Sequence, residues 1–126
     1  MSQTFVAIRY TPAFLPLFQL LGLGPARSGV WVGRDSIRVT MGWGFRAEIP
    51  RGAVLEFGPD DAPVGGLGVH GWGGRWLVNG SARGLVRLQI RPGVRAWVMG
   101  IPVQLRTLRL SLVAPQELTT LLNDHP

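Results

Sequence analysis

The feature that most constrains this fold is an alternation of apolar and polar residues that returns along most of the chain. Ile37 and Val39, for example, alternate with Ser36, Arg38 and Thr40, and residues 45–49 and 85–91 repeat the pattern. A β-strand points successive side chains to opposite faces, so this period of two predicts strands with one buried and one wet face. Glycine and proline interrupt the pattern at short intervals, which predicts six to seven short antiparallel strands.

A second pattern replaces the alternation near the C-terminus. Pro115 stands at a first helical position, and Leu118, Leu121 and Leu122 form one apolar stripe, which predicts an α-helix over residues 114–123. A helix this short is not stable alone and must pack on the sheet. We therefore expect a mainly β fold, a small curled barrel or bent sandwich that the helix caps.

The length of 126 residues fits one domain, residues 1–126. We divide it into an N-terminal strand with a short helix or turn (1–27), the barrel strands (28–112) and the C-terminal helix. The Pro- and Asp-rich residues 58–66 predict a mobile loop. Asn79 followed by Gly80 predicts a tight hairpin turn, because both residues tolerate positive φ.

The charge is strongly basic, with thirteen arginines, no lysine, seven acidic residues and a net charge of +6. Codon use in a GC-rich genome explains the choice of arginine over lysine, but the excess of positive charge still favours anionic partners. The absence of cysteine and of a signal-peptide pattern predicts a cytoplasmic protein. The longest apolar stretch, residues 13–24, falls short of the ~20 residues that span a bilayer, so no transmembrane segment is expected.

The residues that carry chemistry do not assemble into a predicted catalytic site. Asp60 and Asp61 are adjacent and point apart in an extended chain, whereas an acid/base pair must converge on one bond. His70 and His125 are the only histidines, and we expect no metal site. His70 is interpreted either as a base or as a buried hydrogen-bonding ring. We predict no enzymatic activity and no cofactor.

Two groups of residues are candidates for binding. The first comprises arginines that alternation places opposite the apolar face of their strands: Arg34, Arg38, Arg46, Arg87 and Arg91. If the strands pair, some of these converge into a basic patch that can hold anions bidentately, and otherwise they form a solvated face.

The second group is the pair of glycine-flanked tryptophans, Trp43 and Trp72. Each could sit at a membrane interface or anchor a partner, because a tryptophan offers a large surface and one polar group. The alternative is that each folds back as a plug of the core.

Three stretches resemble the bacterial pleckstrin-homology-like domains, especially a set of short uncharacterised actinobacterial proteins. They are residues 43–50 (WGFRAEIP), 74–81 (GRWLVNGS) and 108–115 (LRLSLVAP), the last leading into 118–122. The resemblance covers about residues 28–123. It implies a barrel in which a strand ending in serine runs into a proline-started helix that plugs one end. Members that bind phosphoinositides use basic residues near the first hairpin, and this chain departs from them in having no lysine and no clustered basic loop.

These observations favour a non-enzymatic binding or adaptor module. Its partner would be an anionic membrane surface or a protein, engaged through the arginine face and the loop tryptophans, with the protein cytoplasmic or peripheral to the membrane. The alternative function is a carrier that holds an apolar small molecule inside the barrel. Nucleic acid is disfavoured because exposed aromatic platforms do not recur regularly, and an open edge strand would allow a homodimer.

Overall fold

The structure is a computed structural model, and it describes residues 3–123. Within that range the chain forms nine strands, two α-helices and three short 3-10 turns. The strands are β1 (Thr4–Val6), β2 (Ser28–Val32), β3 (Ser36–Met41), β4 (Phe45–Pro50), β5 (Val54–Pro59), β6 (Gly68–Trp72), β7 (Arg75–Asn79), β8 (Leu85–Val98) and β9 (Ile101–Ser111). The helices are α1 (Leu15–Leu20) and α2 (Pro115–Asn123), and the 3-10 turns are Pro12–Phe14, Pro25–Arg27 and Arg51–Ala53.

All nine strands belong to one sheet in the order β1-β2-β3-β4-β8-β9-β7-β6, with β5 paired to β8. The expected mainly β fold with a C-terminal helix is confirmed. The sheet is open, with β1 and β6 at its two ends, so of the two expected arrangements, a small curled barrel or a bent sandwich, a closed barrel does not form. Another correction is that β7 and β9 are parallel, in a sheet predicted to be antiparallel throughout.

The strand count was also too low, and β6 shows why. Gly68 and Gly71 interrupt its pattern, and both have positive φ. The exposed His70 stands between them. Period-two alternation cannot identify such a strand, which forms because it pairs with β7 over its full length.

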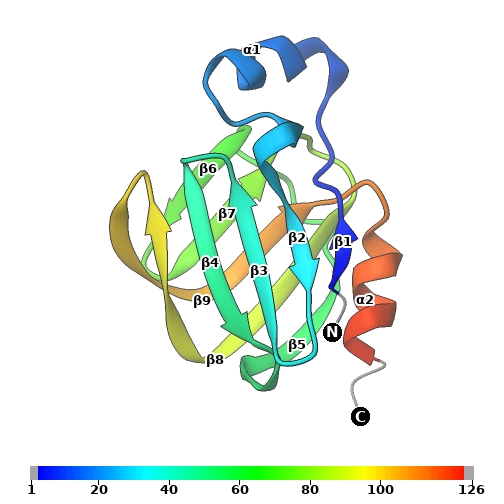
Figure 1. Ribbon diagram of the computed structural model, residues 1–126, viewed down its shortest axis with the longest axis vertical. Helices are drawn as coiled ribbons and strands as arrows, with labels where there is room; N and C mark the ends of the chain where they lie inside the picture. Colours follow the sequence, from blue (N-terminus) through cyan, green and yellow to red (C-terminus); the bar gives the residue numbers. More distant parts are fainter. Residues whose placement is uncertain (1–2, 124–126) are drawn as a thin grey trace.

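The long strand β8 bends the sheet into two layers (Figure 1). The first half of β8 pairs with β5 and its second half pairs with β4. Between Gln89 and Val94 its register with β9 shifts. The first layer is β1 to β4 with the second half of β8. The second layer is β5, the first half of β8, β9, β7 and β6. A bent sandwich therefore describes the arrangement better than a barrel.

The core fills the space between the two layers. It is built from the apolar residues of the alternating strands, such as Ile37 and Val39 of β3 and Leu88 of β8, all fully buried. Leu118 and Leu122 of α2 add to this core, as the apolar stripe predicted. The helix begins at Pro115 and packs against β5. His125 and the other residues after Asn123 lie outside the described range.

The segment that follows β1 pairs with residues that follow β9 and β7. Ile8 bridges Leu112 and Tyr10 bridges Gly80. The fully buried Ser111 hydroxyl accepts from the Gly80 N–H over 3.0 Å and donates to the Arg9 carbonyl over 2.9 Å. One side chain thus links three segments that are distant in sequence.

The tight hairpin predicted at Asn79 and Gly80 does not form. Asn79 is fully buried, and its Nδ2 donates to the Gly66 carbonyl at 3.1 Å and to the Ser81 carbonyl at 2.9 Å. These bonds tie the chain before β6 to the chain after β7. β7 does not form a hairpin with β8 and pairs with β9 and β6 instead. The correction follows from burial, because a buried amide must find hydrogen-bond partners.

Candidate functional site

The seven predicted site residues do not form one patch. Arg38 and Arg46 lie on the outer face of the first layer, Arg87 and Trp72 belong to the second layer, and Trp43 is at the tip of the β3–β4 hairpin. Alternation placed each strand arginine on the correct face, since these side chains are exposed. It did not foresee that the bend in β8 separates them.

The remaining two predicted arginines are Arg34 and Arg91. Arg34 is exposed in the turn between β2 and β3. Arg91 is exposed on β8, where the register with β9 shifts. Neither position contributes to a cluster with Arg87.

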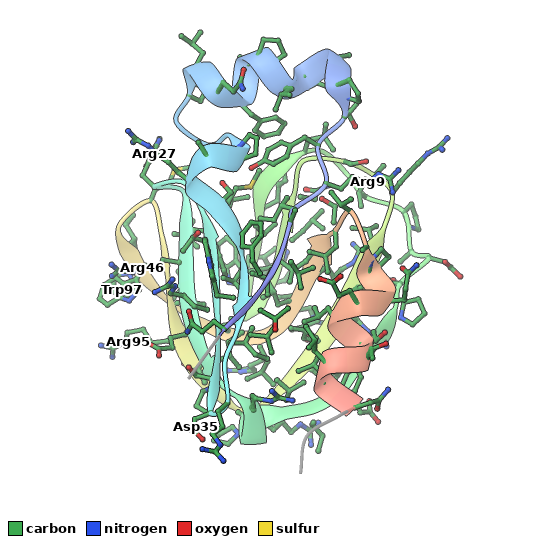
Figure 2. All side chains as sticks on the ribbon, turned by 45° about the vertical axis from the view of Figure 1, so that its right-hand side comes forward. Arg9, Arg27, Asp35, Arg46, Arg95 and Trp97 are labelled. Atoms are coloured by element: carbon green, nitrogen blue, oxygen red, sulfur yellow. The ribbon has the colours of Figure 1, made fainter. Side chains whose placement is uncertain are left out.

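On the first layer, the two arginines stack on tryptophans of neighbouring strands. The Arg38 guanidinium lies 4.8 Å from the Trp31 ring centroid, and that of Arg46 lies 5.6 Å from the ring of Trp97. Figure 2 shows Arg46 and Trp97 together at one side of the molecule. Glu48 opposes Arg38 on β4, which partly neutralises this face. Each exposed stack contributes about 0.5–1 kcal/mol, so this surface is consistent with a structural role.

A different surface is the most exposed apolar part of the described chain. Residues 12–24, which we call the apolar lobe, project beyond one end of the sheet as the first 3-10 turn and α1 (Figure 1). The exposed large hydrophobic side chains of the lobe are Phe14, Leu17, Leu20 and Leu21, of which Leu20 is 83% exposed. The sequence predicted a short helix or a packed turn here, and α1 is the helix, although of its residues only Phe18 is buried.

The lobe is held against the sheet by a small set of specific contacts. Phe18 packs edge-on against Tyr10, with ring centroids 5.3 Å apart. The Tyr10 hydroxyl donates to the Leu23 carbonyl over 2.6 Å, and burial raises the pKa of this hydroxyl. The Trp43 indole N–H donates to the Leu21 carbonyl over 2.7 Å. Trp43 itself is 59% exposed, so the core-plug alternative is wrong for it, and its ring extends the apolar surface.

Charge is distributed unevenly around the lobe. Residues 10–26 contain no charged side chain, and no acidic residue precedes Asp35. Arg9 and Arg27 lie at the base of the lobe on either side, and Asp35 lies at the far end of the molecule (Figure 2). An uncharged run bordered by arginines is the sequence signal that could have identified this surface. No helix in residues 3–123 is long and apolar enough to cross a membrane.

The second layer carries an open groove of about 910 Å³ on its outer face, which we call the arginine groove. Arg75, Arg87 and Arg109 line it together with Asp60, His70 and Trp72. In the strand register Arg87 of β8 lies beside Arg109 of β9, and Gln89 lies beside Thr107, which in turn lies beside Arg75 of β7. The groove floor is therefore a band of polar side chains across three strands.

Arg109 and Asp60 form the wall of the groove. The Arg109 guanidinium pairs with the Asp60 carboxylate and donates to the Ala62 carbonyl over 2.6 Å. Although partial burial acts to raise it, the pKa of Asp60 lies below its ordinary value because the Ala62 amide donates to the carboxylate and Arg109 pairs with it. The mobile loop predicted over residues 58–66 is thus corrected in two respects: Gly58 and Pro59 belong to β5, and the contacts of Arg109 hold the loop at Asp60 and Ala62.

Trp72 stands at the lip of the groove with 85% of its surface exposed, which excludes the core-plug alternative. It precedes a two-residue turn in which Gly73 and Gly74 both have positive φ, a conformation that tight hairpins require. His70 is exposed, and its Nε2 lies 2.5 Å from the Leu67 carbonyl, so the expectation of a buried ring was wrong.

The sequence did not single out Arg75 or Arg109, because strand alternation does not show which strands are neighbours. As for metals, no three His, Asp or Glu side chains of residues 3–123 come together as a binding group. Comparison of the chain with family models, with curated protein sequences and with solved structures gives no match. The function must therefore be argued from the surfaces themselves.

Proposed function

We propose that this protein is a non-enzymatic module that binds the anionic surface of a membrane by inserting the apolar lobe among the lipid headgroups. The observation that carries the proposal is the lobe itself: a projecting, uncharged surface bordered by Arg9 and Arg27. Exposed apolar surface of this kind marks an interaction site in a folded protein. The proposed location is the cytoplasmic side, where the leaflet is anionic.

The energetics fit reversible binding. Fully burying a leucine or phenylalanine side chain contributes roughly 1.5–3 kcal/mol. The four side chains of the lobe are between 48% and 83% exposed, so their burial supplies on the order of 4 kcal/mol. Each arginine close to an anionic surface adds about 1 kcal/mol. The total is comparable with the anchoring by one myristoyl chain, which is weak and reversible.

The shape and composition favour a membrane over a protein partner. The lobe is convex and projects from the sheet (Figure 1), whereas a flat or concave patch is the usual shape of a docking site for a folded protein. Trp43 lies at the edge of the lobe with its N–H satisfied by Leu21, and amphipathic aromatic rings are enriched at headgroup level. The arginines at the base complement lipid phosphates.

Sedimentation with vesicles tests the proposal. We expect the protein to pellet with vesicles of phosphatidylcholine mixed with phosphatidylglycerol more than with phosphatidylcholine alone, and less at high salt, because screening weakens charge attraction. Replacing Leu17 and Leu20 together by Asp should abolish this binding. Both side chains are exposed, 52% and 83%, so the fold should tolerate the change.

The matched control is Leu55→Asp. Leu55 is 57% exposed on β5, at the end of the molecule away from α1 (Figure 1). This variant should bind vesicles as the wild type does. Absence of vesicle binding by the wild type, or equal loss in the Leu55 variant, overturns the proposal, and the lobe would then be a contact for a protein.

The relationship to the bacterial pleckstrin-homology-like domains is likewise a proposal. It is supported by the strand β9, which ends at Ser111 and leads to a helix started by Pro115. The open sheet and the parallel pair β7–β9 depart from the expected barrel. The alternative of an apolar carrier gains no support, because buried side chains fill the space between the layers.

A further inference from the structure

The arginine groove offers positive charge that its own residues do not neutralise. Asp60 is the acidic residue that lines the groove, and Arg109 engages it. Arg87 lowers the pKa of Asp60 from a distance, yet neither Arg87 nor Arg75 has an ion-pair or hydrogen-bond partner for its guanidinium within residues 3–123. Both side chains are exposed and available to a ligand.

The positions of these two arginines favour an extended ligand over a compact one. Arg75 is on β7 and Arg87 is on β8, with β9 between them. Their strands are two spacings apart, about 10 Å, and the two residues belong to different rows of the register. A single phosphate needs donors that converge on one point, whereas successive carboxylates along an extended chain match two separated guanidinium groups.

The size of the groove points the same way. Its lining extends from the floor on β8, β9 and β7 to His70, Gly71 and Trp72 of β6. Three strand spacings amount to about 14 Å, the length of four or five extended residues at ~3.3 Å each. Gln89 and Thr107 lie side by side on this floor and can hydrogen-bond a peptide backbone. Trp72 at the lip offers an aromatic surface for one apolar side chain.

We propose that the arginine groove binds an extended acidic peptide segment of a partner protein. Its carboxylates pair with Arg75 and Arg87, and an apolar side chain packs on Trp72. Single-stranded nucleic acid fits less well, because it requires a series of stacking platforms and this groove exposes one tryptophan, Trp72, at its lip. The site is independent of the apolar lobe, so the protein would join an acidic partner to a membrane.

Fluorescence anisotropy with a labelled peptide of sequence EELEEL tests this proposal. We expect the peptide to bind in a salt-sensitive way, and its neutral counterpart QQLQQL to bind far more weakly. Arg75→Glu and Arg87→Glu should each lower the affinity roughly tenfold or more, because each removes a charge-assisted hydrogen bond and adds repulsion. Trp72→Ala should lower it severalfold.

Arg83→Glu is the matched control. Arg83 is exposed in the turn after Ser81, and its replacement by Glu changes the net charge by the same amount as the two groove substitutions. It should alter the affinity by less than about threefold. Amide shifts in an assigned nitrogen–proton spectrum should map the peptide to Gln89, Thr107 and Trp72. The double variant Leu17→Asp with Leu20→Asp should keep peptide binding, which separates this site from the membrane proposal.

Several outcomes overturn the inference. One is equal affinity for EELEEL and QQLQQL. Another is that Arg83→Glu weakens peptide binding as much as Arg75→Glu or Arg87→Glu does. A third is that the peptide shifts amide signals of the first layer and not those of the groove. Tighter binding of inorganic phosphate or of a thymidine oligonucleotide than of EELEEL would reassign the groove to that ligand. Retained affinity in both Arg75→Glu and Arg87→Glu, with folding verified by circular dichroism, would exclude the groove as the binding site.

Discussion

The indole N–H of Trp43 donates to the carbonyl of Leu21, 2.7 Å away. This bond joins the tip of the β3–β4 hairpin to the apolar lobe. Beside this bond the backbone at Gly42 lies close to the backbone at Gly22. A Cβ added to Gly42 would lie 1.9 Å from the Gly22 carbonyl oxygen, so no larger residue fits there. The lobe is therefore held by the hairpin as well as by its own turns.

Trp43→Phe should loosen the lobe without unfolding the protein. The substitution keeps an aromatic ring and removes the hydrogen bond, which in this exposed position contributes about 1 kcal/mol or less. We expect faster hydrogen exchange at the amides of residues 21–23 and weaker vesicle binding. Trp72→Phe is the control, and unchanged exchange in the Trp43 variant would show that the bond does not restrain the lobe.

Ser111→Ala should destabilise the whole fold. The buried hydroxyl serves the Gly80 N–H and the Arg9 carbonyl, and leaving a buried polar group unsatisfied costs about 1–3 kcal/mol. Urea denaturation measures the loss in the free energy of unfolding. Ser36→Ala is the comparison, because the Ser36 hydroxyl bonds Glu48 at an exposed position, and we expect a change below about 0.5 kcal/mol. Equal effects would argue against a special role for Ser111.

Asp60 should make stability depend on pH in the acid range. Its pKa is lowered in the folded state, so it contributes stability above the ordinary aspartate pKa, and this contribution is lost as the pH falls through the lowered value. Asp60→Asn should therefore be less stable than the wild type near about pH 7 and equal to it near about pH 2. The difference should stay below about 1 kcal/mol because solvent screens the pair.

Urea denaturation of both proteins at the two pH values gives the measurement, and Asp61→Asn serves as the control for charge, since Asp61 is exposed next to it. A stability difference for Asp60→Asn that persists unchanged at the acid end would contradict the linkage. So would an equal effect of Asp61→Asn near neutral pH.

Arg51→Met should weaken the attachment of α2. The Arg51 guanidinium donates to the Leu121 carbonyl over 2.6 Å and to the Gly33 carbonyl over 3.0 Å. It satisfies a carbonyl in the last turn of the helix and favours the negative end of the helix dipole. We expect a loss of about 1–3 kcal/mol in the free energy of unfolding, with Arg83→Met unchanged. Faster hydrogen exchange of backbone amides in α2 alone, in the Arg51→Met variant, would show that the lost stability comes from the attachment of this helix.

The parts of the fold that could be predicted are those in which burial follows sequence position directly. Ile37 and Val39 were assigned to the core by alternation, and Leu118 by helical spacing, and all three are fully buried. The start of α2 at Pro115 was also predicted, because proline is pre-organised for a first helical turn.

The features that escaped prediction depend on which segments become neighbours. Alternation showed that Arg87 faces outward, but not that Arg109 of β9 would lie beside it. Asn79 was interpreted from its local turn preference, and burial overrode that preference. The apolar lobe was predicted as a short helix or a packed turn, but its exposure was not predicted, because spacing alone does not tell how much of a helix the rest of the chain will cover.

The hydrogen bond from Ser111 to Arg9 spans 102 positions of the sequence, and this separation bears on how the protein is made. A ribosome adds roughly 5–20 residues per second, so some 5–20 s pass between the synthesis of the two partners. During that time the segment that anchors the lobe has no β9 to pair with. The apolar residues that follow Arg9 are therefore exposed on the nascent chain before β9 exists, and a membrane or a chaperone can meet them before the sheet does.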